Sequence, residues 1–401
     1  MSNSRLVRIT SVFIWDLAIT LYLKFTLGLL HQPMGFDIAI LYKAEVLLKN
    51  GHSPYELKGF VYPPPSALFL LPIAYFHKNV VSILAVIVNT VLYFAILLLS
   101  YKLAHIRILS LEASFIALIF YFSQTFQGEL ELGNLTAFIV FLLVVQLYLI
   151  SIDRWTSSVA VLAISLMVKP MLIFIGLIYL VHRKYKSLGF GILLFVIGFV
   201  ASLPTIPKWN KVFSKLPSVL NRSGSGIIFN SAYVGILRYL KLDSLLIDLI
   251  RLFITLLIVI AFVNLDKLLL ENDFRITVEA TLILLWTFLC GTLSEYHYML
   301  CFIPIICFIV STKNQFANFF SCVGILWLNG ILLPIDPFSF SHHVVAVTFF
   351  RMLGMTLLAI GLFIPTARIK RFTNKNHFSY ANFTKKQDYF TSSKEPKLIK
   401  Q

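Results

Sequence analysis

Charged side chains are scarce in this sequence. Asp, Glu, Lys and Arg make up only 13% of the 401 residues and 58% are hydrophobic, whereas a soluble globular domain has about 25% charged residues. Apolar runs of about 20 residues recur along the chain, which is the length that crosses a bilayer core of about 30 Å as a helix. The composition therefore excludes an ordinary soluble domain and predicts an all-α polytopic membrane protein. A β-barrel would instead show alternating segments of about ten residues.

Cysteine is rare as well, and all four cysteines lie inside apolar runs. Their spacing fits neither a zinc site nor a disulfide framework, so we expect them to pack in the core. The sequence also lacks an H-E-x-x-H motif, a Walker loop, a G-x-S-x-G elbow and an Asp-x-Asp pair. The last absence argues against a cytoplasmic nucleotide-sugar transferase, which usually holds a diphosphate through a carboxylate-bound divalent ion. We expect neither a metal nor another cofactor.

The few charges are mostly positive, and the formal net charge is +16. The basic residues gather in short loops between apolar runs and in the tail, which is typical of the cytoplasmic segments of a multi-pass protein of the cell membrane. We therefore expect contact with membrane lipids and not with nucleic acid. The chain divides into an integral membrane domain, residues 1–366, and a basic cytoplasmic tail, residues 367–401.

Eleven apolar runs are candidate spans. They are residues 9–30, 80–101, 111–126, 135–152, 156–181, 187–203, 244–263, 276–293, 297–311, 316–334 and 343–365.

The number of crossings must agree with the charges at the two termini. Both termini are basic and are expected in the cytoplasm, but eleven single crossings would separate them. The run 156–181 contains Lys169-Pro170, and a proline inside a helix removes a hydrogen bond and clashes with the preceding turn. We therefore expect this run to enter the membrane and return to the same side. The result is about 11–12 transmembrane helices, with residues 31–65 outside the cell.

The first external loop places one aspartate between two stiff segments. Residues 40–48 carry the apolar face of a short helix that stops at Gly51, and Glu45 lies at the border of that face. Such a helix is suited to the membrane interface. Prolines 63–65 then stiffen an extended return, because proline fixes φ and holds the residue before it extended. Asp37 is thus held at the membrane surface, either as an N-cap of the helix or as a chemical group, and the residues alone leave both open.

Several other polar residues lie where a bilayer makes them costly. For Lys169, beside the proline break, we favour a function, because an ionisable residue within a span is expensive. Arg251 and Glu279 look like interhelical partners or snorkelling residues. His297 is either an interfacial histidine or a site residue. Glu131 either binds a cation or only reflects the difference in charge between the external and cytoplasmic loops.

The longest external loop, residues 204–240, contains Arg222, Asn230 and Arg238 and a Gly-Ser hinge at 223–226. Cations on a mobile segment suit a substrate that carries a phosphate, because guanidinium groups bind phosphate through charge-assisted hydrogen bonds.

The first loop, FDIAILYKAEVLLKNGHSPYE followed by FVYPPPSALFLLP, resembles the signature of the GT-C membrane glycosyltransferases of family eighty-seven. This family comprises polyprenyl-phosphate-mannose-dependent α-mannosyltransferases. The elements of the signature present in the loop are Asp37, Tyr42, Ala44, Gly51, Pro54, Tyr55, Tyr62, Pro63 and Pro64.

Four later segments extend the resemblance over about residues 10–310. GNLTAFIVFLLVV is similar to a Gly-Gln-x-Asn opening of a span, with Asn134 and Thr136 in place of the longer amides. The Lys-Pro span puts Lys169 on the family lysine. FNSAYVGILRYL is similar to an Asn-Gln-Ser segment that begins here at Asn230, and LSEYHYML is similar to a Ser-x-x-His-His element in which His297 is retained.

The resemblance implies a GT-C fold with juxtamembrane helices in the first external loop and an extracytoplasmic active site. It implies an inverting transfer of a mannosyl or other hexosyl residue from a polyprenyl-phosphate-linked donor to a lipid-linked glycan or glycolipid acceptor. Two alternatives stay open: a polyprenyl-phosphate-linked pentose (arabinofuranosyl) donor, and a lipid or sugar transporter. By the resemblance, Asp37 is the general base and His297 a second catalytic residue. The residues expected to bind substrate are Tyr42, Tyr62, Glu131, Asn134, Lys169, Arg222, Asn230 and Arg238.

Overall fold

The computed structural model describes residues 2–211, 241–265, 272–291, 296–311 and 343–363, with a few isolated positions between them. Within these ranges the chain forms α-helices and short 3₁₀ segments, and no described residue lies in a strand. The predicted all-α class is therefore confirmed. The predicted span 316–334 and the predicted basic tail lie outside the described residues, apart from positions 323, 324 and 326.

The elements follow one another along the chain with short connections. They are α1 (Ser2–Leu29), α2 (Phe36–Lys49), η1 (Pro54–Glu56), α3 (Pro64–Leu70), η2 (Leu71–Tyr75), α4 (Lys78–Leu103), α5 (Leu111–Tyr121), α6 (Gln124–Leu132), α7 (Thr136–Ser151), α8 (Trp155–Val168), η3 (Pro170–Gly176), α9 (Leu177–Val181), α10 (Tyr185–Ser202), η4 (Leu203–Thr205), α13 (Ser244–Asn264), α14 (Asn272–Cys290), η6 (Tyr296–Phe302), α15 (Ile303–Ser311) and α17 (His343–Phe363).

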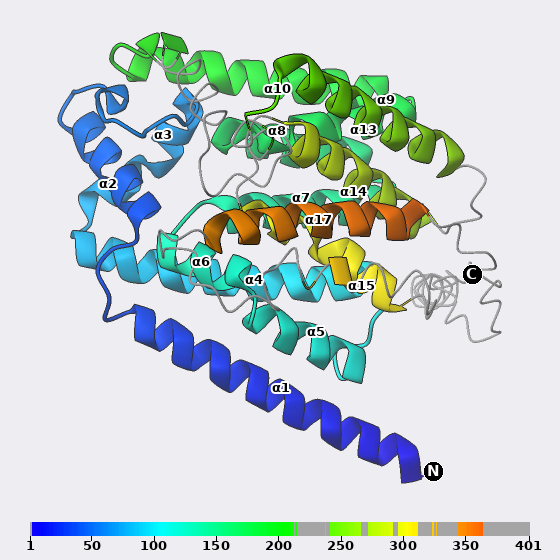
Figure 1. The fold of residues 1–401 in the computed structure, drawn as a ribbon. Coiled ribbons are helices and arrows are strands. Elements are labelled where there is room, and N and C mark those ends of the chain that lie inside the picture. The colour runs from blue at the N-terminus through cyan, green and yellow to red at the C-terminus, as the bar shows by residue number, and fades with distance from the viewer. Residues whose placement is uncertain are drawn as a thin grey trace, which may run out of the picture. The chain divides into compact units, whose positions relative to one another are not determined.

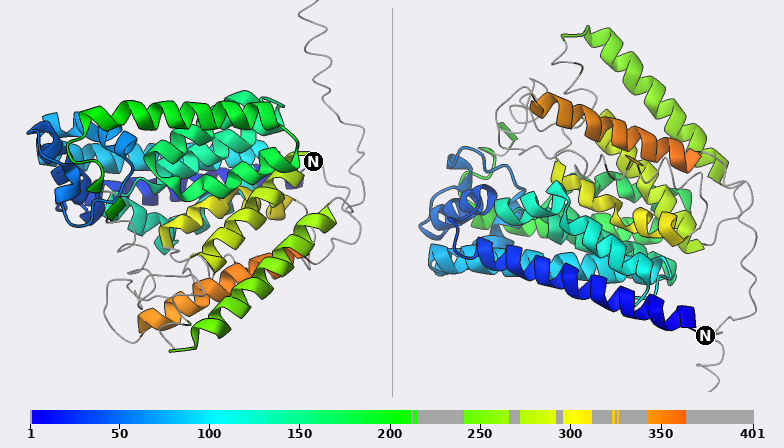
Figure 2. Two further views of the ribbon diagram at one scale, coloured as in Figure 1. Left: turned by 90° about the horizontal axis from the view of Figure 1, so that it is seen from above. Right: turned by 60° about the horizontal axis from the view of Figure 1, so that its bottom comes forward.

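Among the residues that the structure describes, four helical stretches are long and apolar enough to cross a membrane, as judged by length and composition: Arg5–Leu29, Lys78–Leu103, Tyr185–Thr205 and Ser244–Val263. Helices α1, α4, α7 and α10 run roughly alongside one another, and α2 and α3 lie at one end of them (Figures 1 and 2). Helix α7 packs against α4, α8 and α14. It is buried on most of its sides, because its sequence is apolar all round.

The first loop has a small core of its own. Helix α2 packs against η1, η2, α3 and α4, and the loop core contains Leu41, Ala44, Tyr55 and Phe60. The helix ends as predicted, with Gly51 just beyond it at φ +77°. The loop is therefore a folded unit that can hold side chains at fixed positions.

Two details of this loop differ from the prediction. Glu45 does not border the apolar face but is completely buried in it. Pro63 is extended, but Pro64 and Pro65 form the first turn of α3 instead of continuing an extended return. Proline fits this position because the first turn of a helix does not use its N–H groups in intrahelical hydrogen bonds.

The predicted break at Lys169-Pro170 is confirmed. Helix α8 ends just before Lys169, which is extended (φ −152°, ψ 113°), and the 3₁₀ segment η3 begins at Pro170. The chain then turns back, since the ring of Trp155 at the start of α8 lies 5.8 Å from the ring of Tyr179 and 5.2 Å from that of His182. Both ends of the segment therefore lie together. Which side of the membrane they face stays a prediction.

The predicted span 111–126 is wrong in its boundaries. It is divided into α5 and α6, and α6 continues to Leu132, beyond the predicted end of the span. Ser123 interrupts the run because its hydroxyl accepts a hydrogen bond of 3.1 Å from the Phe126 N–H and so caps a new helix. Gly133, at φ +64°, ends that helix in the left-handed conformation.

Candidate active site

Asp37 is the second residue of α2, and its side chain is half-buried. The N-cap position is taken by Gly35, and α2 has no side-chain cap. The carboxylate of Asp37 instead accepts a hydrogen bond of 2.6 Å from Nδ2 of Asn134, which is 97 residues away in the sequence. The N-cap alternative for Asp37 is therefore wrong. The negative charge still lies in the first turn of a helix, where the helix dipole stabilises it.

Asn134 connects Asp37 to a cation. Its Oδ1 atom accepts hydrogen bonds from the Thr136 N–H (3.0 Å), the Thr136 hydroxyl (2.9 Å) and Nζ of Lys169 (3.2 Å). These donors fix the orientation of the amide, because only the oxygen can accept. The NH₂ group must then face Asp37. Asn134 is buried, so the amide is held in place from both sides.

Lys169 reaches this amide from the break between α8 and η3. Its Nζ atom also donates to the Thr136 hydroxyl (3.1 Å) and lies 4.7 Å from the ring centroid of Tyr298 in η6. A cation over an aromatic face is stabilised by about 0.5–2 kcal/mol. The structure thus joins Asp37, Asn134 and Lys169 in one hydrogen-bonded chain, which we call the Asp–Asn–Lys chain.

Two glycines allow the helices that carry this chain to meet. A side chain on Gly35 would collide with the backbone of Glu131 and Leu132 at the end of α6. A side chain on Gly133 would collide with Ile38. Because both positions lack a Cβ, the start of α2 can lie against the end of α6. This close approach sets the position of Asp37 relative to Asn134.

The two glutamates of α6 lie in different surroundings. Glu131 is exposed beside Gly35, near the start of α2. Glu129 is buried and accepts a hydrogen bond of 2.8 Å from the Ala137 N–H, so that it caps the start of α7. The role of Glu131 in substrate binding stays a prediction.

Tyr42 and Tyr62 lie in the first loop. The Tyr42 hydroxyl donates to the Phe76 carbonyl (3.2 Å), and the Tyr62 carbonyl accepts from the Tyr55 hydroxyl (2.9 Å). These contacts hold the loop together, and a role for either residue in binding substrate stays a prediction.

The remaining predicted residues fall on parts of the chain that are not described. Arg222, Asn230 and Arg238 lie outside the described residues, and of His297 only the backbone, in η6, is described. Within the described part of the chain, no group of three or more His, Cys, Asp or Glu side chains could hold a metal ion.

Three residues of the site were not assigned a role from the sequence. Thr136 and Tyr298 had a signal, since both stand within the motifs of the resemblance. Asn89 had none: it lies in the middle of an apolar helix and donates to the Asn134 carbonyl (3.2 Å).

The site therefore presents a half-buried carboxylate and an ammonium group at the meeting point of α2, the α6–α7 junction, the α8–η3 break and η6. The Asn134 amide lies between the two charges, and each is hydrogen-bonded to it. Such a pair can accept a proton at one end and stabilise a developing anion at the other.

The chain belongs to glycosyltransferase family 87, whose sequence model matches residues 60–311. The matched range contains Asn134, Lys169 and Tyr298, and Asp37 precedes it. This is a family of GT-C membrane glycosyltransferases, and the predicted fold class is therefore confirmed. The chain is a membrane protein with several apolar helices.

Two curated relatives are both named alpha-(1->3)-arabinofuranosyltransferase and come from Mycobacterium tuberculosis strains CDC 1551 / Oshkosh and ATCC 25618 / H37Rv. Each is 24% identical over 283 residues, which cover 69% of this chain and 64% of the relative. The chain thus spans somewhat less than two thirds of the length of these relatives.

Proposed function

We propose that the chain transfers a mannosyl or other hexosyl residue from a polyprenyl-phosphate-linked donor to a lipid-linked glycan or glycolipid acceptor. The reaction takes place on the extracytoplasmic side and inverts the anomeric centre. Membership of family 87 supports a glycosyl transfer. The observation that carries the proposal is the Asp–Asn–Lys chain, because it places one base and one cation in a fixed relation.

In the proposed reaction, Asp37 accepts the proton of an acceptor hydroxyl while that oxygen attacks the anomeric carbon. The polyprenyl phosphate leaves from the opposite face of the sugar, so a β-linked donor gives an α-linked product. The transition state resembles an oxocarbenium ion, and a nearby carboxylate stabilises it. General base catalysis of this kind contributes about 10²–10⁴-fold to the rate.

Lys169 stabilises the phosphate that leaves. Its ammonium group does not pair directly with Asp37 but reaches it through the Asn134 amide. The amide therefore positions both groups. A monophosphate leaving group carries less charge than a diphosphate, so the proposal uses no metal. Arg222, Arg238 and His297 are the further residues that we propose for contacts with the donor and for catalysis.

A second candidate is transfer of an arabinofuranosyl residue from the same type of lipid carrier. The observation that favours it is the name shared by the two relatives. The steps assigned to Asp37 and Lys169 are the same for a pentose, because they act on the acceptor hydroxyl and on the phosphate. A transporter is disfavoured by the family membership.

The test is transfer by the purified full-length chain in lipid nanodiscs. Polyprenyl-phosphate-mannose and polyprenyl-phosphate-arabinofuranose are each supplied with candidate glycolipid acceptors, and mass spectrometry follows donor loss and product gain. Mannosyl transfer supports the first candidate, and arabinofuranosyl transfer supports the second. If neither donor is consumed with any acceptor while Asp37→Asn and wild type behave alike, the proposed function is wrong.

A further inference from the structure

Two opposite charges lie on the outer side of α1. Asp16 and Lys24 are both exposed, although they belong to the stretch Arg5–Leu29, which is long and apolar enough to cross a membrane. Thr20, midway between them, is exposed as well. Because these three residues follow one another at intervals of four, they lie on one side of the helix. We call this side the α1 face.

The opposite side of α1 packs mainly against α5 (Figure 1). The indole N–H of Trp15 donates to the Ile108 carbonyl (2.7 Å), and the Tyr22 hydroxyl donates to the Ala117 carbonyl (2.7 Å). Both side chains are buried. Rotation of α1 would break these hydrogen bonds, and an unsatisfied polar group within a bilayer is costly. The α1 face therefore stays turned outward.

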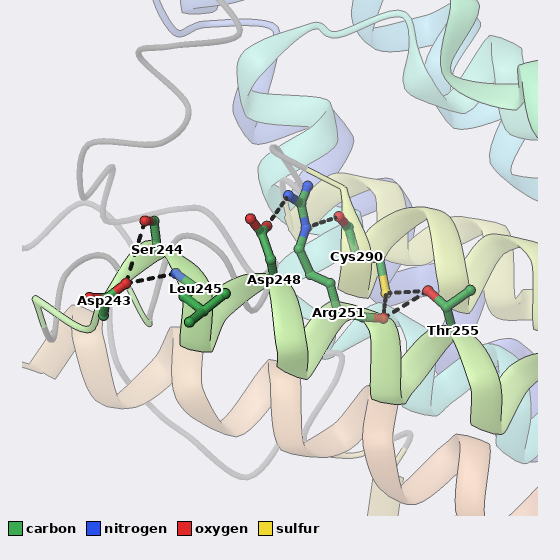
Figure 3. A network of polar contacts seen from close by, with 7 residues as sticks. All are labelled: Asp243, Ser244, Leu245, Asp248, Arg251, Thr255 and Cys290. Atoms are coloured by element: carbon green, nitrogen blue, oxygen red, sulfur yellow. Dashed lines mark hydrogen bonds and ion pairs between the residues drawn. The ribbon is translucent and has the colours of Figure 1, made fainter.

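The two charges of the α1 face are not paired. They are separated by about 12 Å along the helix axis. Within the described part of the chain, neither side chain makes a hydrogen bond or an ion pair, with the other or with a third residue. The charges of α13 differ in this respect, because Arg251 donates to the Cys290 carbonyl (2.9 Å) and lies 3.4 Å from Asp248 (Figure 3). The α1 face thus carries two charges that lack a counter-charge.

Asp16 lies near the middle of its stretch. Along the helix axis it is about 17 Å from Arg5 and about 20 Å from Leu29. A charged side chain at this depth in a bilayer is expensive and normally pairs with another charge. Lipid head groups lie at the membrane surface, and the side chain of aspartate is too short to reach them, whereas the long side chain of Lys24 can extend toward the nearer end of α1. The counter-charge of Asp16 therefore has to be supplied within the membrane.

A second copy of the chain does not supply this counter-charge. All copies insert in the same direction, and a symmetric dimer has its two-fold axis along the membrane normal. Asp16 would then face the Asp16 of the second copy, and Lys24 would face the second Lys24, each at equal depth. Like charges repel, and the repulsion is stronger in a medium of low dielectric constant. The charge pattern therefore favours a different partner.

We propose that the α1 face binds a transmembrane helix of another protein. That helix carries a basic residue opposite Asp16 and an acidic residue opposite Lys24, about 12 Å apart along its axis. Thr20 lies between the two charges, and its small side chain allows the two helices to approach closely. The proposal concerns a binding surface and is independent of the sugar that the chain transfers, so failure of the proposed function would not affect it.

The experiment measures binding between the full-length chain and designed transmembrane peptides in phosphatidylcholine liposomes. Two peptides of leucine and alanine have the same composition. The complementary peptide has arginine at its middle and glutamate eight residues later, and the exchanged peptide has these two residues swapped. Energy transfer from a dye at the amino terminus of the chain to a dye on the peptide gives the affinity.

The complementary peptide should bind at least about tenfold more tightly than the exchanged peptide, since polar pairs between membrane helices stabilise their association. Equal affinities, or no binding of either peptide, would show that bilayer lipid covers the α1 face and would overturn the proposal. Energy transfer between two labelled copies of the chain that is lost in Asp16→Asn would overturn it in favour of a dimer.

Variants assign the preference to the α1 face. Asp16→Asn should remove most of the difference between the two peptides. Asp248→Asn is the matched control, since Asp248 is an exposed carboxylate in another stretch that could cross a membrane, and it should keep the wild-type preference. Asp16→Lys combined with Lys24→Glu should reverse the preference. If this double variant gives no folded protein, Asp16→Asn decides by itself, and an unchanged preference in it contradicts the proposal.

Crosslinking then tests the α1 face in the native membrane. A photoreactive amino acid replaces Leu27, an exposed residue on the same side of α1. A crosslinked protein supports the proposal when its attached span carries a basic residue at mid-depth and when Asp16→Asn abolishes the product. Products with lipid alone overturn the proposal, as do products with a second copy of the chain or with a span that has no basic residue.

Discussion

Replacing Glu45 by Gln should remove a pH dependence from the stability of the first loop. Glu45 is completely buried in the core of that loop, and neither carboxylate oxygen has a hydrogen-bond partner among the described residues. Lys49, one turn further along α2, donates to the Ala74 carbonyl (3.3 Å). Burial raises the pKa of Glu45 from 4.5 to about 8. The pKa of the neighbouring Tyr55 is also raised, mainly by burial and to a smaller extent by the negative charge of Glu45.

The sign of the effect follows from the direction of this shift. When the loop opens to water, Glu45 ionises above its ordinary pKa of 4.5, whereas in the folded loop it keeps its proton up to about pH 8. Between these two pKa values, opening of the loop releases the proton of Glu45. The free energy of opening therefore falls by about 1.4 kcal/mol for each pH unit. From pH 6 to pH 8 the loss is roughly 3 kcal/mol, or about a hundredfold in the opening equilibrium. Above pH 8 it levels off.

Hydrogen exchange of the α2 amides measures this equilibrium, after correction for the intrinsic exchange rate at each pH. Wild-type protection should fall by about a hundredfold from pH 6 to pH 8, and protection in Glu45→Gln should stay constant. Glu56→Gln is the matched control. Glu56 is an acid of the same loop whose pKa is lowered, mainly by a hydrogen bond from Lys208, so it is already ionised at pH 6. The control should behave as the wild type. Equal wild-type protection at both pH values would refute the reasoning.

Three further predictions concern the site. Asp37→Asn should lower kcat by about 10²–10⁴-fold, while size-exclusion profiles and thermal midpoints stay near wild type; near-normal turnover would make Asp37 a structural residue. His297→Ala should lower kcat without loss of expression, and unchanged kinetics would remove His297 from the catalytic residues. Gly35→Ala should separate α2 from α6, because its Cβ would collide with backbone atoms. It should lower kcat at least tenfold, since a catalytic group displaced by 1 Å lowers the rate by about 10²-fold. Wild-type kcat in Gly35→Ala would show that the Asp37–Asn134 contact is dispensable.

Sequence motifs predicted part of the candidate site. Asp37, Asn134 and Lys169 were each singled out from the sequence, and the structure joins them in one chain. Tyr298 stood next to a predicted residue but had no assigned role, because its contact with Lys169 depends on how η6 packs. Asn89 lies in an apolar helix without a local signal, and only the packing of α4 against α7 brings it to Asn134.

The burial of Glu45 and the division of the predicted span 111–126 show where local patterns failed. Periodicity places Glu45 near the edge of the apolar face of α2. The segments η1, η2 and α3 pack against α2, and how far they cover that edge decides whether Glu45 is buried. The span divides because Ser123 turns its hydroxyl back to the Phe126 N–H. A serine in an apolar run is compatible with a continuous helix as well, so the sequence alone does not distinguish the two cases.

The sequence by itself determined the features that depend on neighbouring residues. The length of the apolar runs requires helices in a bilayer, the ring of Pro170 ends α8, and Gly51 allows the chain to leave α2. Only the tertiary structure decided which distant groups meet. Asp37 and Asn134 are 97 residues apart, and their contact depends on the packing of α2 against α6 over two glycines. Local bonding limits the conformation of each segment, but long-range packing determines which segments touch.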